Sequence, residues 1–180
     1  MSRGAATLRV FYALLPPPAL AIALGDLARD IARRAHGRPV PADNIHLTLA
    51  FIGAWPAARL GSLTAAGAAI ECEAMRITLD TQGGFRRAGI AWIGASSPPP
   101  ALDALAKSFA VALAANGISF DDQRFHPHVT LARRCRGPYP HEAAGPFLWD
   151  IDSIALMRSE TGADGARYTQ LASWALRDKA

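Results

Sequence analysis

Apolar residues follow two different spacings along the chain, and the alternation between them predicts a mixed α+β fold. Over residues 19–35 and 100–116, leucine, isoleucine or phenylalanine recurs three or four positions apart, which is typical of amphipathic helices. Gly117 follows the second segment, where a left-handed helix cap is expected. A third helix is expected over residues 56–71. Runs of strand-forming residues predict strands over 8–15, 45–52, 75–81, 89–94, 125–132, 149–159 and 168–176.

The order of these elements indicates a loose internal duplication. Gly83 and Gly84 predict a hairpin connection between two central strands, and residues 162–165 predict the turn of a closing hairpin. Helices interspersed with hairpins favour an α+β fold over a doubly wound parallel sheet. We therefore expect residues 1–180 to form one domain of two antiparallel lobes, related by a pseudo-twofold axis, with flanking helices and a central cleft.

Composition indicates a globular protein, and its positive charge favours an anionic partner without naming one. Its 180 residues are 51% hydrophobic and carry a formal net charge of +4, with a sequence pI of about 9.6. Cys72 and Cys135 alone make neither a disulfide framework nor a thiolate zinc site. Pro16–Pro18 interrupt the apolar run after Arg9, which argues against a signal peptide. We expect a cytoplasmic monomer that does not cross a membrane.

One four-residue pattern occurs twice, at residues 46–49 and 128–131. Each copy reads histidine, any residue, threonine, leucine, and each lies in an apolar, strand-forming run. Histidine titrates near neutrality, so one imidazole can accept a proton while a second, as imidazolium, donates one. In-line displacement at phosphorus needs both transfers, at opposite ends of the reacting group. Thr48 and Thr130 share a strand face with His46 and His128 and offer hydroxyls to phosphate oxygens.

The doubled pattern has two alternative explanations. With five histidines and eight threonines in the chain, chance predicts about 0.2 matches, so a second copy in the same phase is informative. Each pair could still be the solvated face of an amphipathic strand. His126 and His128 could also chelate zinc together with His46 or His141, although no acidic residue stands beside either motif. We leave His126 outside the expected catalytic set.

These segments resemble the two-histidine phosphoesterases, and among them the bacterial RNA 2',3'-cyclic phosphodiesterases once described as 2'-5' RNA ligases. The resemblance covers nearly the whole chain and includes Ser159, Gly165 and Tyr168 near the C-terminus. Its other segments are residues 9–14, 44–53, 83–85, 90–94 and 125–133.

The resemblance implies a bilobal α+β fold and hydrolysis of a terminal 2',3'-cyclic phosphate to a 2'-phosphate, without metal or cofactor. By this analogy His128 is the proton acceptor that activates water, and His46 is the proton donor to the departing 3' oxygen. The analogy gives Thr48 and Thr130 the non-bridging oxygens of the phosphate. Substrate-binding roles fall to Arg133, which adds charge-assisted bonds to the phosphate, to Phe11, which stacks on the terminal base, and to Tyr168.

Other functions stay open at this stage. The chain could act on a small cyclic nucleotide or an ADP-ribose derivative, or it could bind RNA without catalysis. The connection over residues 136–147 is short and rich in proline and glycine, which leaves any substrate contacts from this segment open. Arg86 and Arg87 could reach an RNA backbone, or they could form a solvated basic loop.

Overall fold

The computed structural model describes residues 6–120, 125–162 and 165–178. Within these ranges it has three α-helices, α1 (Pro18–Arg34), α2 (Leu60–Ala68) and α3 (Pro100–Ala115), and short 3-10 turns that include η1 (Ala42–Asn44) and η3 (Arg86–Ala88). Its strands in the same ranges are β1 (Thr7–Leu14), β2 (Arg38–Pro39), β3 (Leu47–Pro56), β4 (Met75–Phe85), β5 (Ile90–Gly94), β6 (His128–Arg133), β7 (Ala143–Ile151), β8 (Ser153–Gly162) and β9 (Gly165–Ala175).

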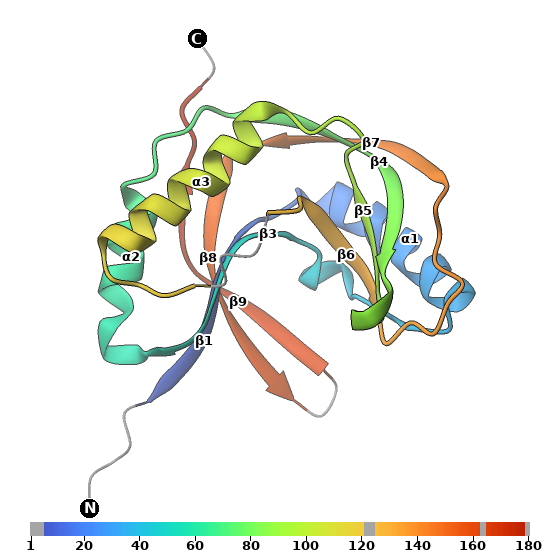
Figure 1. The fold of residues 1–180 in the computed structure, drawn as a ribbon, viewed down its shortest axis with the longest axis horizontal. Helices are drawn as coiled ribbons and strands as arrows, with labels where there is room; N and C mark the ends of the chain where they lie inside the picture. Colours follow the sequence, from blue (N-terminus) through green and yellow to red (C-terminus); the bar gives the residue numbers. More distant parts are fainter. Residues whose placement is uncertain (1–5, 121–124, 163–164, 179–180) are drawn as a thin grey trace, which may run out of the picture.

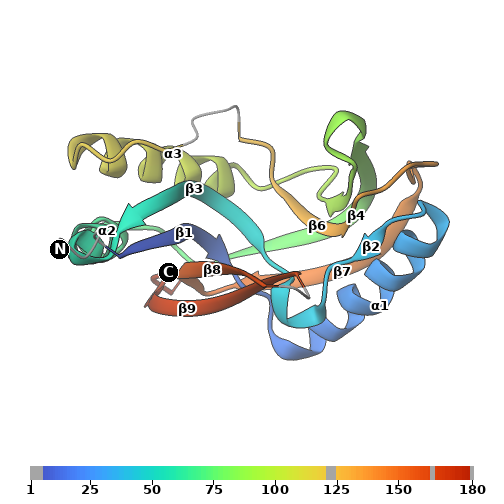
Figure 2. The ribbon, with the colours of Figure 1, turned by 90° about the horizontal axis from the view of Figure 1, so that it is seen from below.

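The strands form one strongly bent sheet in the order β7-β4-β5-β6-β3-β1-β8-β9, with β2 beside β6 (Figures 1 and 2). Neighbouring strands are antiparallel, and most pairs are aligned over several residues. At the middle of the sheet, β3 and β6 are aligned only through Leu47 and Val129. We call this junction the seam. It separates the β1 lobe (β3, β1, β8, β9) from the β4 lobe (β6, β5, β4, β7), so the prediction of a two-lobed α+β fold is confirmed.

Each long helix covers a strand of the opposite lobe. Helix α1 follows β1 in the chain but packs on β6 and β2, whereas α3 follows β5 and packs on β3. Tyr12 of β1 is fully buried against Phe109 of α3, with ring centroids 4.5 Å apart, and its hydroxyl donates to the Leu63 carbonyl oxygen over 2.6 Å. The helices and the sheet side that they cover form the main hydrophobic core. A second, smaller hydrophobic cluster is formed by Phe11, Ala13, Ala155 and Met157.

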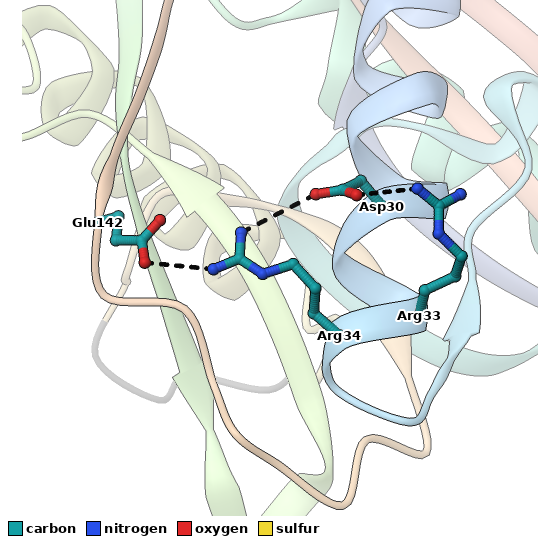
Figure 3. A network of polar contacts seen from close by, with 4 residues as sticks. All are labelled: Asp30, Arg33, Arg34 and Glu142. Atoms are coloured by element: carbon teal, nitrogen blue, oxygen red, sulfur yellow. Dashed lines mark hydrogen bonds and ion pairs between the residues drawn. The ribbon is translucent and has the colours of Figure 1, made fainter.

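Ion pairs tie the C-terminal end of α1 to the connection between β6 and β7 (Figure 3). Arg34 lies 3.2 Å from Glu142 of that connection and 3.9 Å from Asp30, while Arg33 lies 2.9 Å from Asp30. All four side chains are largely exposed, so each pair contributes at most about 1 kcal/mol to stability. The arginines of this helix are therefore already matched by carboxylates.

The predicted hairpin turn at Gly83 and Gly84 is wrong. Both glycines lie inside β4, opposite Trp92 and Ala91 of β5, and the chain reverses at η3 and Gly89. A Cβ on Gly83 would lie 2.3 Å from the Trp92 ring, and one on Gly84 would lie 2.1 Å from the Tyr139 ring. These glycines are thus needed for close packing on the two faces of the strand.

Other element boundaries also differ from expectation. The predicted helix over 56–71 is reduced to α2 after a 3-10 turn, and the predicted strand over 149–159 is divided by Asp152 between β7 and β8. The expected strand over 125–132 begins at His128, and β2 was not predicted. Residues 163–164 of the predicted closing turn lie outside the described residues. In the described part of the chain, no helix is long and apolar enough to cross a membrane.

Candidate active site

The two motif histidines are anchored in the same way at the starts of their strands. His46 immediately precedes β3, and its Nδ1 lies 2.7 Å from the carbonyl oxygen of Asn44. His128 is the first residue of β6, and its Nδ1 lies 2.7 Å from the carbonyl oxygen of His126. A carbonyl oxygen only accepts, so each Nδ1 carries the proton that it donates. In the neutral imidazole this leaves Nε2 of both histidines as the proton-accepting atom.

The strand register brings the two motifs together. Leu47 and Val129 are paired across the seam and are fully buried in the core beneath the sheet. Because successive residues of a strand point to opposite faces, the histidine and threonine of each motif lie on the open face. His46 Nε2 lies 3.1 Å from Thr48 Oγ1 on that face. Two imidazoles and two hydroxyls therefore converge at the seam, one pair from each lobe.

Aromatic rings hold each imidazole from the side of its own lobe. His46 lies 4.9 Å from Phe11 and 5.1 Å from Tyr168, measured between ring centroids, and it meets Tyr168 edge to face at 88°. His128 meets Phe85 in the same geometry, at 5.0 Å and 88°. A fixed ring and a backbone hydrogen bond together limit each imidazole to one orientation. The site thus repeats the approximate symmetry of the two lobes.

Burial makes both histidines weak bases in the free protein. Burial is the main cause that lowers the pKa of His46 to about 4, with smaller contributions from the charges of Arg133 and His128, and the Asn44 hydrogen bond partly opposes this effect. The pKa of His128 is also lowered, mainly by burial and further by His126 and Arg133, against the effect of the His126 carbonyl. Both imidazoles are therefore neutral near pH 7 when the site holds no anion.

Arg133 is the residue for which the resemblance to known enzymes implied a phosphate contact. It is the last residue of β6, its side chain is exposed, and its charge lowers the pKa of both His46 and His128. No carboxylate of the described residues lies within ion-pair distance of it. A cation with no carboxylate partner in the described part of the chain, beside two neutral imidazoles, favours the binding of an anion.

The two predicted aromatic contacts differ in accessibility. Phe11 is 3% exposed and packs against both His46 and Tyr168, so its ring supports the histidine rather than facing solvent. Tyr168 of β9 is half-buried and lines a cavity between the lobes together with Arg133. Tyr168 is thus the ring of this pair that a ligand can reach.

Phe85 and Trp92 are site residues that sequence reasoning did not identify. Trp92 is opposite Thr130 in the β5–β6 ladder, and its ring lies 5.0 Å from that of His126, which is exposed. Phe85 contacts both His126 and His128. Their alternation with buried residues of β4 and β5 was the available signal, but it does not tell which face of the sheet is open.

The described residues contain no group of three or more His, Cys, Asp or Glu side chains that could hold a metal ion. His141, one of the ligands considered for a zinc site, lies instead beside Ile31 and Arg34 of α1.

Comparisons with known proteins give consistent matches over most of the chain. A family model described as the 2'-5' RNA ligase superfamily matches residues 16–163. The RNA 2',3'-cyclic phosphodiesterase of Escherichia coli is 35% identical over 142 residues, which cover 78% of this chain and 80% of that protein. The RNA 2',3'-cyclic phosphodiesterase of Thermus thermophilus is 30% identical over 184 residues, covering 94% and 91%. The crystal structure of E. coli LigT complexed with 3'-AMP matches with a TM-score of 0.87 at 30% identity, over 95% of this chain and 99% of that one.

Proposed function

The chain belongs to the 2'-5' RNA ligase superfamily, and we propose that it is an RNA 2',3'-cyclic phosphodiesterase that leaves a 2'-phosphate. The observation that carries this proposal is the pair of histidines at the seam, each donating from Nδ1 to a backbone carbonyl oxygen and each two residues before a threonine on the same strand face. The names of its relatives supply the substrate class. We propose that residues 1–180 work as one two-lobed domain, as a cytoplasmic monomer without metal or cofactor.

In the proposed reaction, Nε2 of His128 removes a proton from a water molecule, whose oxygen attacks phosphorus. The bond between phosphorus and the 3' oxygen breaks on the opposite side, and Nε2 of His46 protonates that oxygen. The product keeps its phosphate on the 2' oxygen. Hydroxyl groups of Thr48 and Thr130 donate to the non-bridging oxygens, and Arg133 stabilises the negative charge that builds on them.

Substrate binding supplies the charge that His46 needs as an acid. In the free protein the pKa of His46 is lowered to about 4, so the imidazole has no proton to give from Nε2 near neutrality. A cyclic phosphate brings a negative charge next to the imidazole and offsets the positive charge of Arg133, and both effects raise the pKa of His46. The proposal therefore links protonation of His46 to occupation of the site.

The terminal base is proposed to stack on Tyr168, because this ring is half-buried and borders the cavity between the lobes. Phe11 contacts both the Tyr168 ring and the His46 ring and so supports them.

Product analysis with an RNA that ends in a 2',3'-cyclic phosphate tests the proposal. We expect a 2'-phosphate product, turnover that a chelator does not reduce, and losses of at least about a thousandfold for His46→Ala and His128→Ala. His141→Ala is the matched control, since this histidine is exposed and lies beside α1. A 3'-phosphate product, or near-normal turnover by either site variant, would contradict the assignment.

A further inference from the structure

A cavity of about 290 Å³ opens beside the catalytic residues, between the two lobes. Strand β2 and the end of β6 contribute Arg38, Arg133 and Arg134, and the β8–β9 hairpin contributes Thr161 and Tyr168. Arg133 and Tyr168 belong to the proposed active site as well, so the cavity adjoins that site at these two residues, which are proposed to contact the terminal nucleotide, and the rest of its lining is left for a neighbouring group. Its volume lies near the lower end for ligand pockets, which suits one nucleotide-sized group.

Among the described residues, no acidic group is paired with the arginines of this cavity. Arg38, Arg133 and Arg134 are exposed, and no carboxylate of the described residues lies within 4.0 Å of their guanidinium nitrogens. Arg38 also stands directly opposite Arg133 in the β2–β6 ladder, and like charges in such a pair are destabilising. Of the twelve other arginines in the described residues, six have a carboxylate partner, namely Arg29, Arg33, Arg34, Arg76, Arg158 and Arg177.

The backbone at Arg134 adds a second local cost. Its φ is +56°, in the left-handed region that residues with a side chain rarely adopt. In a regular strand Arg133 and Arg134 would point to opposite faces, whereas here both line the same cavity. A strained backbone and a repulsive arginine pair at one place are typical of a binding site that is stabilised by its ligand.

We propose that this cavity binds the nucleotide on the 5' side of the cyclic end, with its phosphodiester on Arg38 and Arg134, so that the enzyme prefers RNA ends to cyclic mononucleotides. This inference rests on the proposed function. A cyclic phosphate carries one negative charge, for which Arg133 is already at hand. Arg38 and Arg134 therefore need a second anion, and the next phosphodiester of an RNA chain supplies it. Pro39, Val40 and Pro41 give the cavity an apolar wall for the attached nucleoside.

The cationic surface ends after one such phosphate. A neighbouring cavity of about 570 Å³ shares Asn44 and Thr161 with the first, but Asp43, Glu160 and Arg167 give its lining a net negative charge. We therefore expect most of the gain in affinity to come from the first added phosphodiester, with little from further nucleotides.

The test compares kcat/KM on a 2',3'-cyclic mononucleotide with that on a dinucleotide ending in a 2',3'-cyclic phosphate. Arg38→Gln and Arg134→Gly should each lower kcat/KM on the dinucleotide about tenfold more than on the mononucleotide. Glycine adopts the backbone conformation of residue 134 freely, so Arg134→Gly keeps the fold. Arg136→Gln is the matched control, because it removes one exposed positive charge from the same segment outside the cavity. Arg134→Lys should keep part of the preference.

Three results separate the possible failures. Equal rates of the unmodified enzyme on both substrates would overturn the inference, and so would equal losses on both substrates in the variants, since the cavity would then hold the terminal nucleotide itself. If the enzyme hydrolyses neither substrate, the proposed function is wrong, and the inference about the cavity must be tested by binding instead. Calorimetric titration with a mononucleotide and a dinucleotide that carry a 2'-phosphate then still measures the preference for the longer ligand and its loss in the arginine variants.

Discussion

At the scale of single residues, the properties of His46 arise from its surroundings more than from its motif. A backbone carbonyl fixes its proton on Nδ1, two aromatic rings enclose it, and burial holds its pKa near 4. The imidazole is thus prepared for proton transfer at Nε2 but is uncharged until an anion arrives. This arrangement has a cost that can be measured in the stability of the protein at acidic pH.

We predict that the free energy of unfolding falls as the pH decreases from 6.5 to 4, partly because of His46. The pKa of this group is about 4 in the folded chain and about 6.5 when exposed, so the unfolded chain binds more protons in this interval. The full difference corresponds to about 3 kcal/mol. Urea unfolding at several pH values measures it, and His46→Gln should show a shallower dependence. Identical pH dependences for the two proteins would refute the prediction.

At the scale of elements, β4 shows how one strand serves both the core and the site. Gly83 admits the Trp92 ring on the open face, and Gly84 admits Tyr139 on the core face. Tyr139 also donates from its hydroxyl to the Cys135 carbonyl oxygen over 3.0 Å. The connection after β6 is thereby held against the hairpin that carries Phe85.

Gly84→Ala is expected to destabilise the protein by about 1–3 kcal/mol, because the added methyl group overlaps the Tyr139 ring. Thermal or urea unfolding measures the loss, and a second substitution, Tyr139→Ala, should make the glycine replacement much less harmful. Gly61→Ala is the control. A Cβ at this helical position meets nothing within 4 Å, so stability should stay equal or rise. A similar loss in both single variants would show that the contact with Tyr139 is not the cause.

The elements also show what the sequence could and could not predict. Helix α3 was predictable because its apolar residues recur at helical spacing and a glycine follows them. That glycine, Gly117, has a φ of +62°, as expected for a left-handed helix cap. The two adjacent glycines of β4 look like a turn in the sequence. The aromatic rings that require them come from residues distant in the chain, so the sequence does not show that they belong to a strand. The two-residue strand β2 has no detectable pattern of its own. The motif histidines stood out by repetition, whereas Phe85 and Trp92 resemble ordinary alternating core residues until the open face is known.

At the scale of the whole molecule, the seam is where structure and chemistry depend most on each other. Leu47 and Val129 form the one aligned pair between β3 and β6 in the described chain, and each is adjacent in sequence to a motif histidine. Both side chains are fully buried beneath the sheet. A small shift at this pair therefore changes the distance between the acid and the base.

Leu47→Ala should lower kcat in addition to destabilising the fold, whereas Leu105→Ala of α3 should only destabilise it. Both leucines are buried in the core, so each replacement is expected to cost about 2–5 kcal/mol. Rates are compared at a temperature where both variants are fully folded, as judged by circular dichroism. Equal kcat values for the two variants would show that packing at the seam does not position the histidines.

The crossed helices have a consequence for how the molecule can be divided. The chain contains two units with the same order of strand, helix and motif strand: β1-α1-β3 and β5-α3-β6. The helix of each unit covers the motif strand of the other unit, since α1 packs on β6 and α3 packs on β3. Neither unit can therefore bury its own apolar surface in isolation. A chain of half the length could form this structure only as an intertwined pair, in which each copy lends its helix to the other. Backbone cleavage between β5 and α3 should accordingly give two fragments that fold only when they reassociate. Enzymatic activity should be absent from each fragment alone and should return when the two are mixed.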